Sequence, residues 1–234
     1  MNRLKMLALD CLYPNRCGCC GSRLAYDRLI CAACEAELKE HPAEYCEWAN
    51  QNAEAKYPWD AAAVAFQYEG AAKSGVLAMK DGCRNFAAYA GAVLADRIRA
   101  VTDPEELDCV TWVPITKKRR RIQGYCHAEL LARAVASSLH VPVRDGLLTE
   151  QAGRVRQHQV SGRERTEYAG RFHGTGCGLT GQTILLCDDV LTSGSTLRQC
   201  TSELKADGAA RVIIAAATVR LQTKQSNAVE TEKS

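Results

Sequence analysis

The sequence predicts an α/β fold, a mostly parallel twisted sheet with helices on both faces, preceded by a small cysteine-rich module. Three observations predict this arrangement. From residue 60 onward, apolar runs of strand length alternate with segments of helical periodicity, which is typical of a parallel sheet. Seven of the 13 cysteines fall within residues 11–46. A polar, proline-containing segment, residues 47–58, separates the two parts and is typical of a linker.

Each element of the larger part has its own signal. Residues 211–219 form a continuous apolar, β-branched run, and the helical periodicity of 86–100 ends before the stop signal Thr102-Asp103-Pro104. The expected strands are 60–68, 109–113, 183–187 and 211–219, and the expected helices are 71–81, 86–100, 128–139 and 196–206. The expected domains are a zinc-knuckle module over 1–46, a linker over 47–58, an α/β domain over 59–221 and a disordered tail over 222–234.

Composition excludes several classes of protein. The chain has 234 residues, 47% hydrophobic and 24% charged, which is typical of an ordinary globular protein. A net charge of +3 excludes a uniformly basic surface. No apolar run reaches the roughly 18 residues of a membrane span, and no secretory leader is evident, so we expect a cytoplasmic protein with reduced thiols. The cysteines therefore need a role other than disulfides.

Two C-x-x-C pairs in the module predict a structural zinc site. A tetrahedral Zn²⁺ site needs four ligands, and paired knuckles separated by a short loop supply them. The expected ligands are Cys17, Cys20, Cys31 and Cys34. Cys19 lies inside the first knuckle and is expected to point away from the metal. The alternatives are a set of unrelated buried thiols or a redox C-x-x-C motif.

The most specific segment joins a buried strand to an acidic pair and a hydroxyl-rich turn. Asp188 and Asp189 follow the apolar run 183–187, and the turn Thr192–Thr196 opens a helix. Ligands of open parallel sheets bind outside the carboxyl ends of the strands, and a helix N-terminus favours a phosphate. Adjacent acids can bind two ribose hydroxyls, directly or through Mg²⁺. The alternative is an Asp-Asp turn followed by an ordinary Ser/Thr N-cap.

This segment resembles the phosphoribosyl pyrophosphate (PRPP) motif of type I phosphoribosyltransferases. The resemblance implies that Asp188 and Asp189 hold the ribose hydroxyls. It also implies that the 5′-phosphate is bound by Thr192, Ser193, Gly194, Ser195 and Thr196. From about Cys11 to Val219 the chain resembles the ComF family, associated with natural competence, which joins a zinc module to such a domain. Further matching stretches are Tyr68-Glu69-Gly70, Lys80, Val113-Pro114, Arg121 with Gly124-Tyr125, and residues 128–132.

Local charge suggests where anions bind. Residues 117–171 hold 12 basic and five acidic side chains, a surplus of +7 within a chain of net charge +3. The resemblance makes residues 114–119 a pyrophosphate loop, with Thr116, Lys117, Lys118 and Arg119 as its contacts. The alternative is a solvated basic loop. The arginine-rich segment 150–171 has the composition of a mobile lid, or of a surface that contacts nucleic-acid phosphates.

Two places depart from the family pattern, and one of them is Tyr168, which stands where the family usually has an asparagine. Gly124-Tyr125-Cys126-His127 stands where ComF relatives typically have Gly-Phe-Asn-Gln. His127 shows no metal-ligand spacing and is expected to be a surface or hydrogen-bonded histidine.

Two functions follow from these features. The first is a phosphoribosyltransferase that binds Mg²⁺ and PRPP and transfers to an unknown acceptor. The second is a non-catalytic competence factor that binds single-stranded DNA or proteins of the competence machinery through its basic loops.

Overall fold

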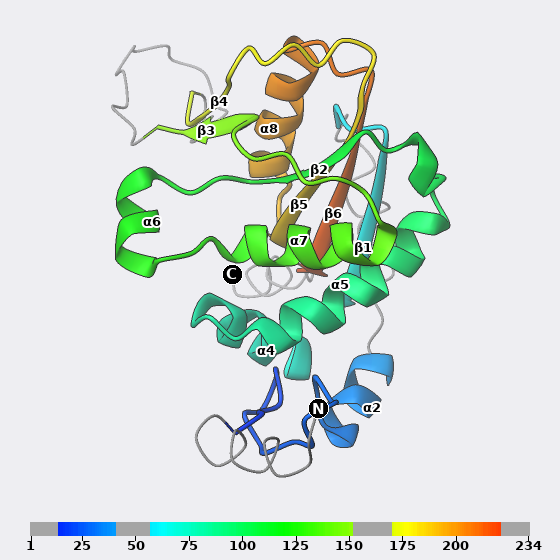
Figure 1. Cartoon of the computed structure of the whole chain (residues 1–234), viewed down its shortest axis with the longest axis vertical. Coiled ribbons are helices and arrows are strands. Elements are labelled where there is room, and N and C mark those ends of the chain that lie inside the picture. The colour runs from blue at the N-terminus through cyan, green and yellow to red at the C-terminus, as the bar shows by residue number, and fades with distance from the viewer. Residues whose placement is uncertain (1–13, 41–56, 152–169, 221–234) are drawn as a thin grey trace, which may run out of the picture.

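The computed structural model of the chain describes residues 14–40, 57–151 and 170–220. Four parallel strands form the central sheet in the order β1-β6-β5-β2 (Figure 1). Their bounds are β1 Ala61–Gln67, β2 Cys109–Trp112, β5 Thr183–Leu191 and β6 Arg211–Val219. Because all four run in one direction, their carboxyl ends meet at one edge of the sheet. The predicted parallel α/β fold is confirmed.

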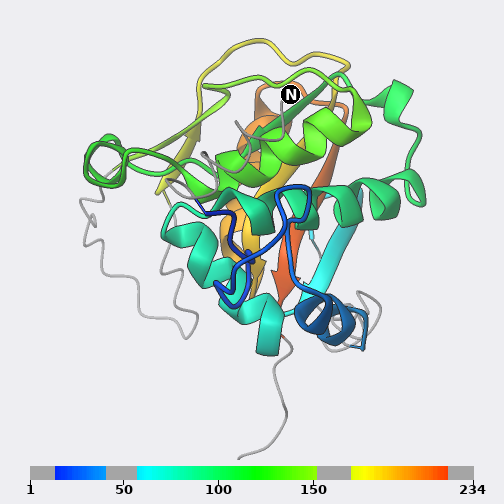
Figure 2. The ribbon, with the colours of Figure 1, turned by 60° about the horizontal axis from the view of Figure 1, so that its bottom comes forward.

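Helices cover both faces of this sheet. Along β5, Leu185 and Cys187 pack into one apolar cluster, while Ile184 and Leu186 pack into another on the opposite face. This alternation follows from the two-residue period of a strand. The first cluster contains α4 Gly70–Lys80, α5 Arg84–Arg99 and α7 His127–Leu139, and the second contains α8 Ser195–Ala206 and the pair β3 Leu148–Glu150 and β4 Phe172–Gly174. Figure 2 shows α5 and α7 together on the near face of the sheet.

Several elements differ from expectation. β5 continues past Cys187 to Leu191, since Asp188 and Val190 still pair with Ala216 and Thr218 of β6. The expected basic loop after β2 contains a helix, α6 Lys117–Gln123. The pattern also did not indicate α2 Ala32–Glu40, the 3-10 turn Pro104–Glu106 or the β3–β4 pair.

The cysteine-rich module, residues 14–40 as described, is docked on the larger part. Its Ile30 and Leu38 belong to the same apolar cluster as Met79 of α4 and Phe86 of α5. In both ribbon views the module lies against α4 (Figures 1 and 2). A segment this short buries little apolar surface alone, so it is stabilised by sharing the core of the sheet domain.

Some expectations fall on residues that the structure does not describe. Most of the predicted linker, the interior of the segment 150–171 and the tail 222–234 lie outside the described residues. Within the described ranges, no helix combines the length and apolar character that crossing a membrane requires.

Candidate functional site

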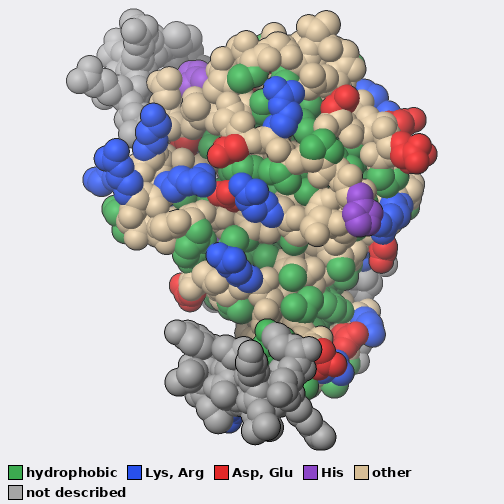
Figure 3. Space-filling model, viewed as in Figure 1, with side chains coloured by type: hydrophobic (Ala, Val, Ile, Leu, Met, Phe, Trp, Pro, Cys, Tyr) green, Lys and Arg blue, Asp and Glu red, His purple; other side chains and the backbone are tan. Residues whose placement is uncertain are grey.

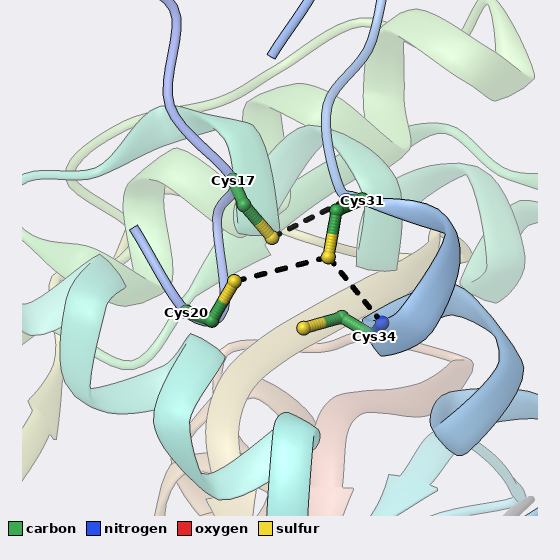
Figure 4. A group of neighbouring side chains, drawn as sticks. All are labelled: Cys17, Cys20, Cys31 and Cys34. Carbon is green, nitrogen blue, oxygen red and sulfur yellow. Dashed lines mark hydrogen bonds between the residues drawn. The ribbon is translucent and has the colours of Figure 1, made fainter. Parts of the chain in front are cut away.

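The four predicted zinc ligands converge in the module (Figure 4). The sulfur atoms of Cys17, Cys20, Cys31 and Cys34 all lie within 4.8 Å of one another. The Sγ atoms of Cys20 and Cys31 are 3.8 Å apart. Tetrahedral Zn²⁺ with bonds of about 2.3 Å requires sulfurs separated by about 3.8 Å, so four thiols gathered within 4.8 Å of one another fit this metal.

Backbone N–H groups donate to two of the four sulfurs and compensate thiolate charge there. Cys31 N–H donates to the Cys17 sulfur at 3.3 Å, and Cys34 N–H donates to the Cys31 sulfur at 3.5 Å. Such outer contacts orient metal ligands. Cys19 is outside the group of four, as expected: it is buried in the apolar cluster, and burial, with the neighbouring thiols, raises its pKa to about 12.

The acidic pair lies at the carboxyl end of β5, and its two side chains face opposite sides of the sheet. By strand alternation Asp189 follows Leu185 and Cys187 toward α4 and α7, whereas Asp188 follows Leu186 toward α8. Asp189 is buried, and its N–H donates to Asp188 Oδ1 at 2.9 Å. The two carboxylates therefore have different partners, although they are adjacent in sequence.

Asp189 faces two nitrogen bases that come from distant elements. Lys80 Nζ, at the end of α4, lies 3.0 Å from Asp189 Oδ2, and His127 Nε2, at the start of α7, lies 3.6 Å from the same oxygen. His127 Nδ1 is buried and has no hydrogen-bond partner among the described residues. The expectation of an ordinary surface or hydrogen-bonded histidine at position 127 is therefore wrong.

These contacts separate the pKa values of the two acids. Burial, then the charge of Asp189, raises the pKa of Asp188 well above its ordinary value. Burial also opposes ionisation of Asp189, but the hydrogen bond with Asp188 and the positive charge of Lys80 outweigh it and lower the pKa of Asp189. Burial, together with Lys80 and Arg119, lowers the pKa of His127, and Asp189 partly opposes this. At neutral pH the site thus has an ionised Asp189 and a neutral His127.

The hydroxyl-rich turn opens helix α8, as predicted. Thr192 and Ser193 are exposed, Gly194 has a left-handed φ of 75°, and α8 begins at Ser195. The Ser193 hydroxyl donates to Ser195 Oγ at 3.2 Å and accepts from Ser195 N–H at 3.4 Å. This N-terminus carries the positive end of the dipole of a 12-residue helix beside the acidic pair. The arrangement suits an anion with three or more oxygen acceptors.

The predicted pyrophosphate stretch begins beside the acids and then forms a helix. Val113 N–H donates to Cys187 O at 2.9 Å, which fixes the chain after β2 next to Asp188. Thr116 Oγ1 then accepts from Arg119 N–H at 3.2 Å and caps α6. Lys117, Lys118 and Arg119–Arg121 are all exposed, and Figure 3 shows basic side chains on and beside α6.

The structure brings the four predicted zinc ligands together, and the ligand-binding roles of the acids and the turn stay predictions. The contacts of Lys80 and His127 with Asp189 were not predicted. Lys80 belongs to the stretches that match the ComF family, which was a usable signal. His127 stands at a departure from that family, and only the fold shows that it faces Asp189.

Comparisons with known proteins match two separate parts of the chain. Residues 127–232 match the phosphoribosyl transferase domain family, and residues 8–59 match the double zinc ribbon domain family. None of the curated proteins matches the chain. Among solved structures, one match is glutamine phosphoribosylpyrophosphate (PRPP) amidotransferase from B. subtilis complexed with ADP and GMP, at 17% identity and a TM-score of 0.39. It covers 61% of this chain, and the chain spans 27% of that enzyme.

The matched ranges contain part of the candidate phosphate site and the whole metal group, while Lys80 and Thr116–Arg119 lie outside both ranges. The first contains the acidic pair, the hydroxyl turn and His127, and the second contains all four cysteines of the metal group. The chain thus combines a cysteine-rich module whose sequence matches the zinc-ribbon family with a parallel α/β domain whose C-terminal part matches the phosphoribosyl transferase family.

Proposed function

We propose that the chain binds Mg²⁺ and PRPP at the carboxyl edge of its sheet and transfers the phosphoribosyl group to an acceptor. One observation carries the proposal: Asp188 and Asp189 lie near the carboxyl end of a central parallel strand, and the turn after that strand opens α8 with Gly194 in a left-handed conformation. This places carboxylates and a positive helix end within one loop length of each other. A ribose 5-phosphate needs hydrogen-bond acceptors for its hydroxyls and an anion site for its phosphate, and this edge of the sheet offers both.

The parts of PRPP correspond to different groups of the site. The 5′-phosphate would accept from N–H and hydroxyl groups of Thr192–Thr196, with Gly194 allowing close approach of the backbone. The ribose hydroxyls would donate to Asp188 and Asp189. The pyrophosphate would lie near Thr116–Arg119, where helix-end N–H groups and cations offset its charge.

Mg²⁺ fits the acidic pair on chemical grounds. Asp188 is held among groups that disfavour its charge, so a bound divalent cation would offset the cost of ionising it. Carboxylate oxygens with retained water are the ligands that Mg²⁺ prefers. When bound, the metal would neutralise negative charge on the pyrophosphate. Lys80 meanwhile keeps Asp189 ionised and oriented.

Calorimetric titration of PRPP in the presence of Mg²⁺ tests the proposal. We expect the wild type to bind and Asp189→Asn to bind at least roughly tenfold more weakly, since a charged hydrogen-bond acceptor contributes about 1.5–3 kcal/mol. The matched control is Asp60→Asn, because Asp60 pairs with Lys205 at 2.7 Å but precedes β1 at the opposite edge. Absence of binding by the wild type, or equal affinity of the two variants, would refute the proposal.

A second function is favoured by the exposed basic face of α6. Residues 117–121 are five consecutive exposed cations, and only Arg120 has an acidic partner in the described structure, Glu129 at 2.9 Å. Through this face the chain would bind single-stranded DNA or acidic protein partners, in keeping with the competence role that the ComF resemblance implies. If four cations each neutralise one phosphate, DNA affinity should fall roughly 50-fold between 50 and 200 mM salt. A salt-independent affinity would contradict such contacts.

A further inference from the structure

Helix α4 connects the cysteine-rich module to the acidic pair. Its last residue, Lys80, places Nζ 3.0 Å from Asp189 Oδ2. The module contacts the N-terminus of α4 and, beyond its C-terminus, the first turn of α5, and Figure 1 shows α4 between the module and the rest of the domain. The position of Lys80 therefore depends on two sets of contacts outside the sheet.

The first contact is at the N-terminus of α4. Its own N-cap residue, Glu69, makes no side-chain cap bond. Instead Glu37, on α2 of the module, accepts from Ala71 N–H at 2.9 Å. A carboxylate at this position satisfies an otherwise unpaired N–H and interacts favourably with the helix dipole. A Cβ at Gly70 would lie 1.9 Å from Glu37 Oε1, so the glycine leaves room for this cap.

The second set of contacts is beyond the C-terminus of α4, where the chain turns into α5. Asn85 Nδ2 donates to Asn15 Oδ1 at 2.8 Å and to Arg16 O at 2.7 Å. These two acceptors directly precede the first zinc ligand, Cys17. These hydrogen bonds thus join the start of α5, a few residues after Lys80, to the residues that precede the first knuckle.

Phe86 packs against both the module and α4. A Cβ at Gly18, inside the knuckle, would lie 2.4 Å from Phe86 N, so the module backbone packs directly on the start of α5. The fully buried Phe86 ring in turn fills the space that a side chain at Gly75 of α4 would need. Module, Phe86 and α4 consequently form one packed unit.

We propose that the zinc module is a clamp that sets the position of Lys80 at the acidic pair, with Glu37 and Asn85 as positioning residues. For its effect on ligand affinity this inference rests on the proposed binding of PRPP. Zinc fixes the knuckles, the knuckles and α2 fix both ends of α4, and α4 presents the Lys80 ammonium to Asp189. Loosening either end of α4 weakens ligand binding without altering any group that touches the ligand.

The test compares Glu37→Ala with Glu35→Ala in the full-length, zinc-loaded protein. Glu35 lies on the same helix, and its ion-pair partners among the described residues are both in the module, Arg28 at 3.1 Å and Lys39 at 3.0 Å. Hydrogen–deuterium exchange of residues 70–80 is measured first, because it needs no ligand. Faster exchange in Glu37→Ala alone is the expected result. Equal exchange in the two variants overturns the clamp, whether or not PRPP binds.

Titration with Mg²⁺ and PRPP then tests the link to Lys80. We expect Glu37→Ala to weaken binding roughly three- to tenfold, as loss of a helix cap would, and Glu37→Gln, which keeps an oxygen acceptor, to restore much of it. In a Lys80→Met background Glu37→Ala should cause no further loss, since its effect acts through Lys80. Additive losses would show a general structural effect and overturn the inference. If the wild type does not bind PRPP, the proposed function fails and the exchange data alone decide on the clamp.

Discussion

Neutralising the two adjacent acids should change the stability of the ligand-free protein in opposite directions. Asp189→Asn removes the partner of Lys80, 3.0 Å away, and should destabilise the fold. Asp188→Asn removes a carboxylate whose ionisation is opposed by burial and by Asp189, and should stabilise it. Both variants should nevertheless bind PRPP more weakly. Asp188→Asn should therefore be more stable than the wild type and yet have a lower affinity for PRPP.

The expected loss of stability in Asp189→Asn follows from the distance and exposure of the Lys80–Asp189 ion pair. At 3.0 Å two unit charges attract by about 1.4 kcal/mol in water and about 5.5 kcal/mol at an effective dielectric constant of 20. Lys80 is 39% exposed and Asp189 12% exposed, so solvent screening and side-chain ordering leave a net contribution of about 1 kcal/mol. A loss of that size lowers Tm by about 2–4 °C in a chain of this length. For Asp188→Asn we expect Tm to rise, because the variant lacks the carboxylate whose ionisation the folded site disfavours.

Thermal unfolding in buffer without Mg²⁺ measures both effects, and pH provides the control. The raised pKa of Asp188 costs the wild type stability as pH rises above about 4. In that range the Asp188 carboxyl ionises in the unfolded chain, whereas burial and Asp189 oppose its ionisation in the folded protein. The advantage of Asp188→Asn should therefore grow from pH 4 toward pH 7. A lower Tm for Asp188→Asn at pH 7, or an advantage that does not depend on pH, would refute this account of the site.

Two further predictions concern the metal group and His127. Cys34→Ala should reduce bound zinc from one per chain to nearly none, whereas Cys19→Ala, a buried neighbour outside the group of four, should retain it; elemental analysis decides, and loss of zinc in Cys19→Ala would contradict the ligand set. Burial lowers the pKa of His127 below 6.5, so at acidic pH this imidazole binds a proton more readily in the unfolded chain than in the folded protein, and acid destabilises the fold. The free energy of unfolding should thus fall more between pH 7.5 and 5.5 in the wild type than in His127→Gln, as measured by urea titration, and equal falls would contradict it.

The sequence pattern predicted the bounds of an element correctly where the buried residues of that element form a continuous or periodic apolar pattern. The bounds of β6, Arg211–Val219, coincide with the apolar run in the sequence, because both faces of this strand are buried. The expected end of β5 at Cys187 was too early, since charged residues resemble a strand end although Asp188 still pairs with Ala216. Helix α6 has no buried residue, so no apolar periodicity could indicate it; the Thr116 cap and the left-handed Gly124 define it instead.

The partners of Asp189 could not be predicted from periodicity or spacing. Lys80 and His127 come from different helices on one face of the sheet, and only the crossover topology brings them to one carboxylate. The same holds for Glu37, whose bond to Ala71 N–H joins two parts of the chain that composition alone treats as separate domains. Motif spacing identified the zinc ligands because all four lie within one short segment.

The most direct test of the central claim is a crystal structure of the protein with Mg²⁺ and PRPP. We expect the 5′-phosphate within hydrogen-bonding distance of the backbone N–H groups of Thr192–Thr196, and the ribose beside Asp188 and Asp189, at the positive end of α8. Ligand density against α6 or elsewhere on the surface, with the turn and the acids uncontacted, would contradict it.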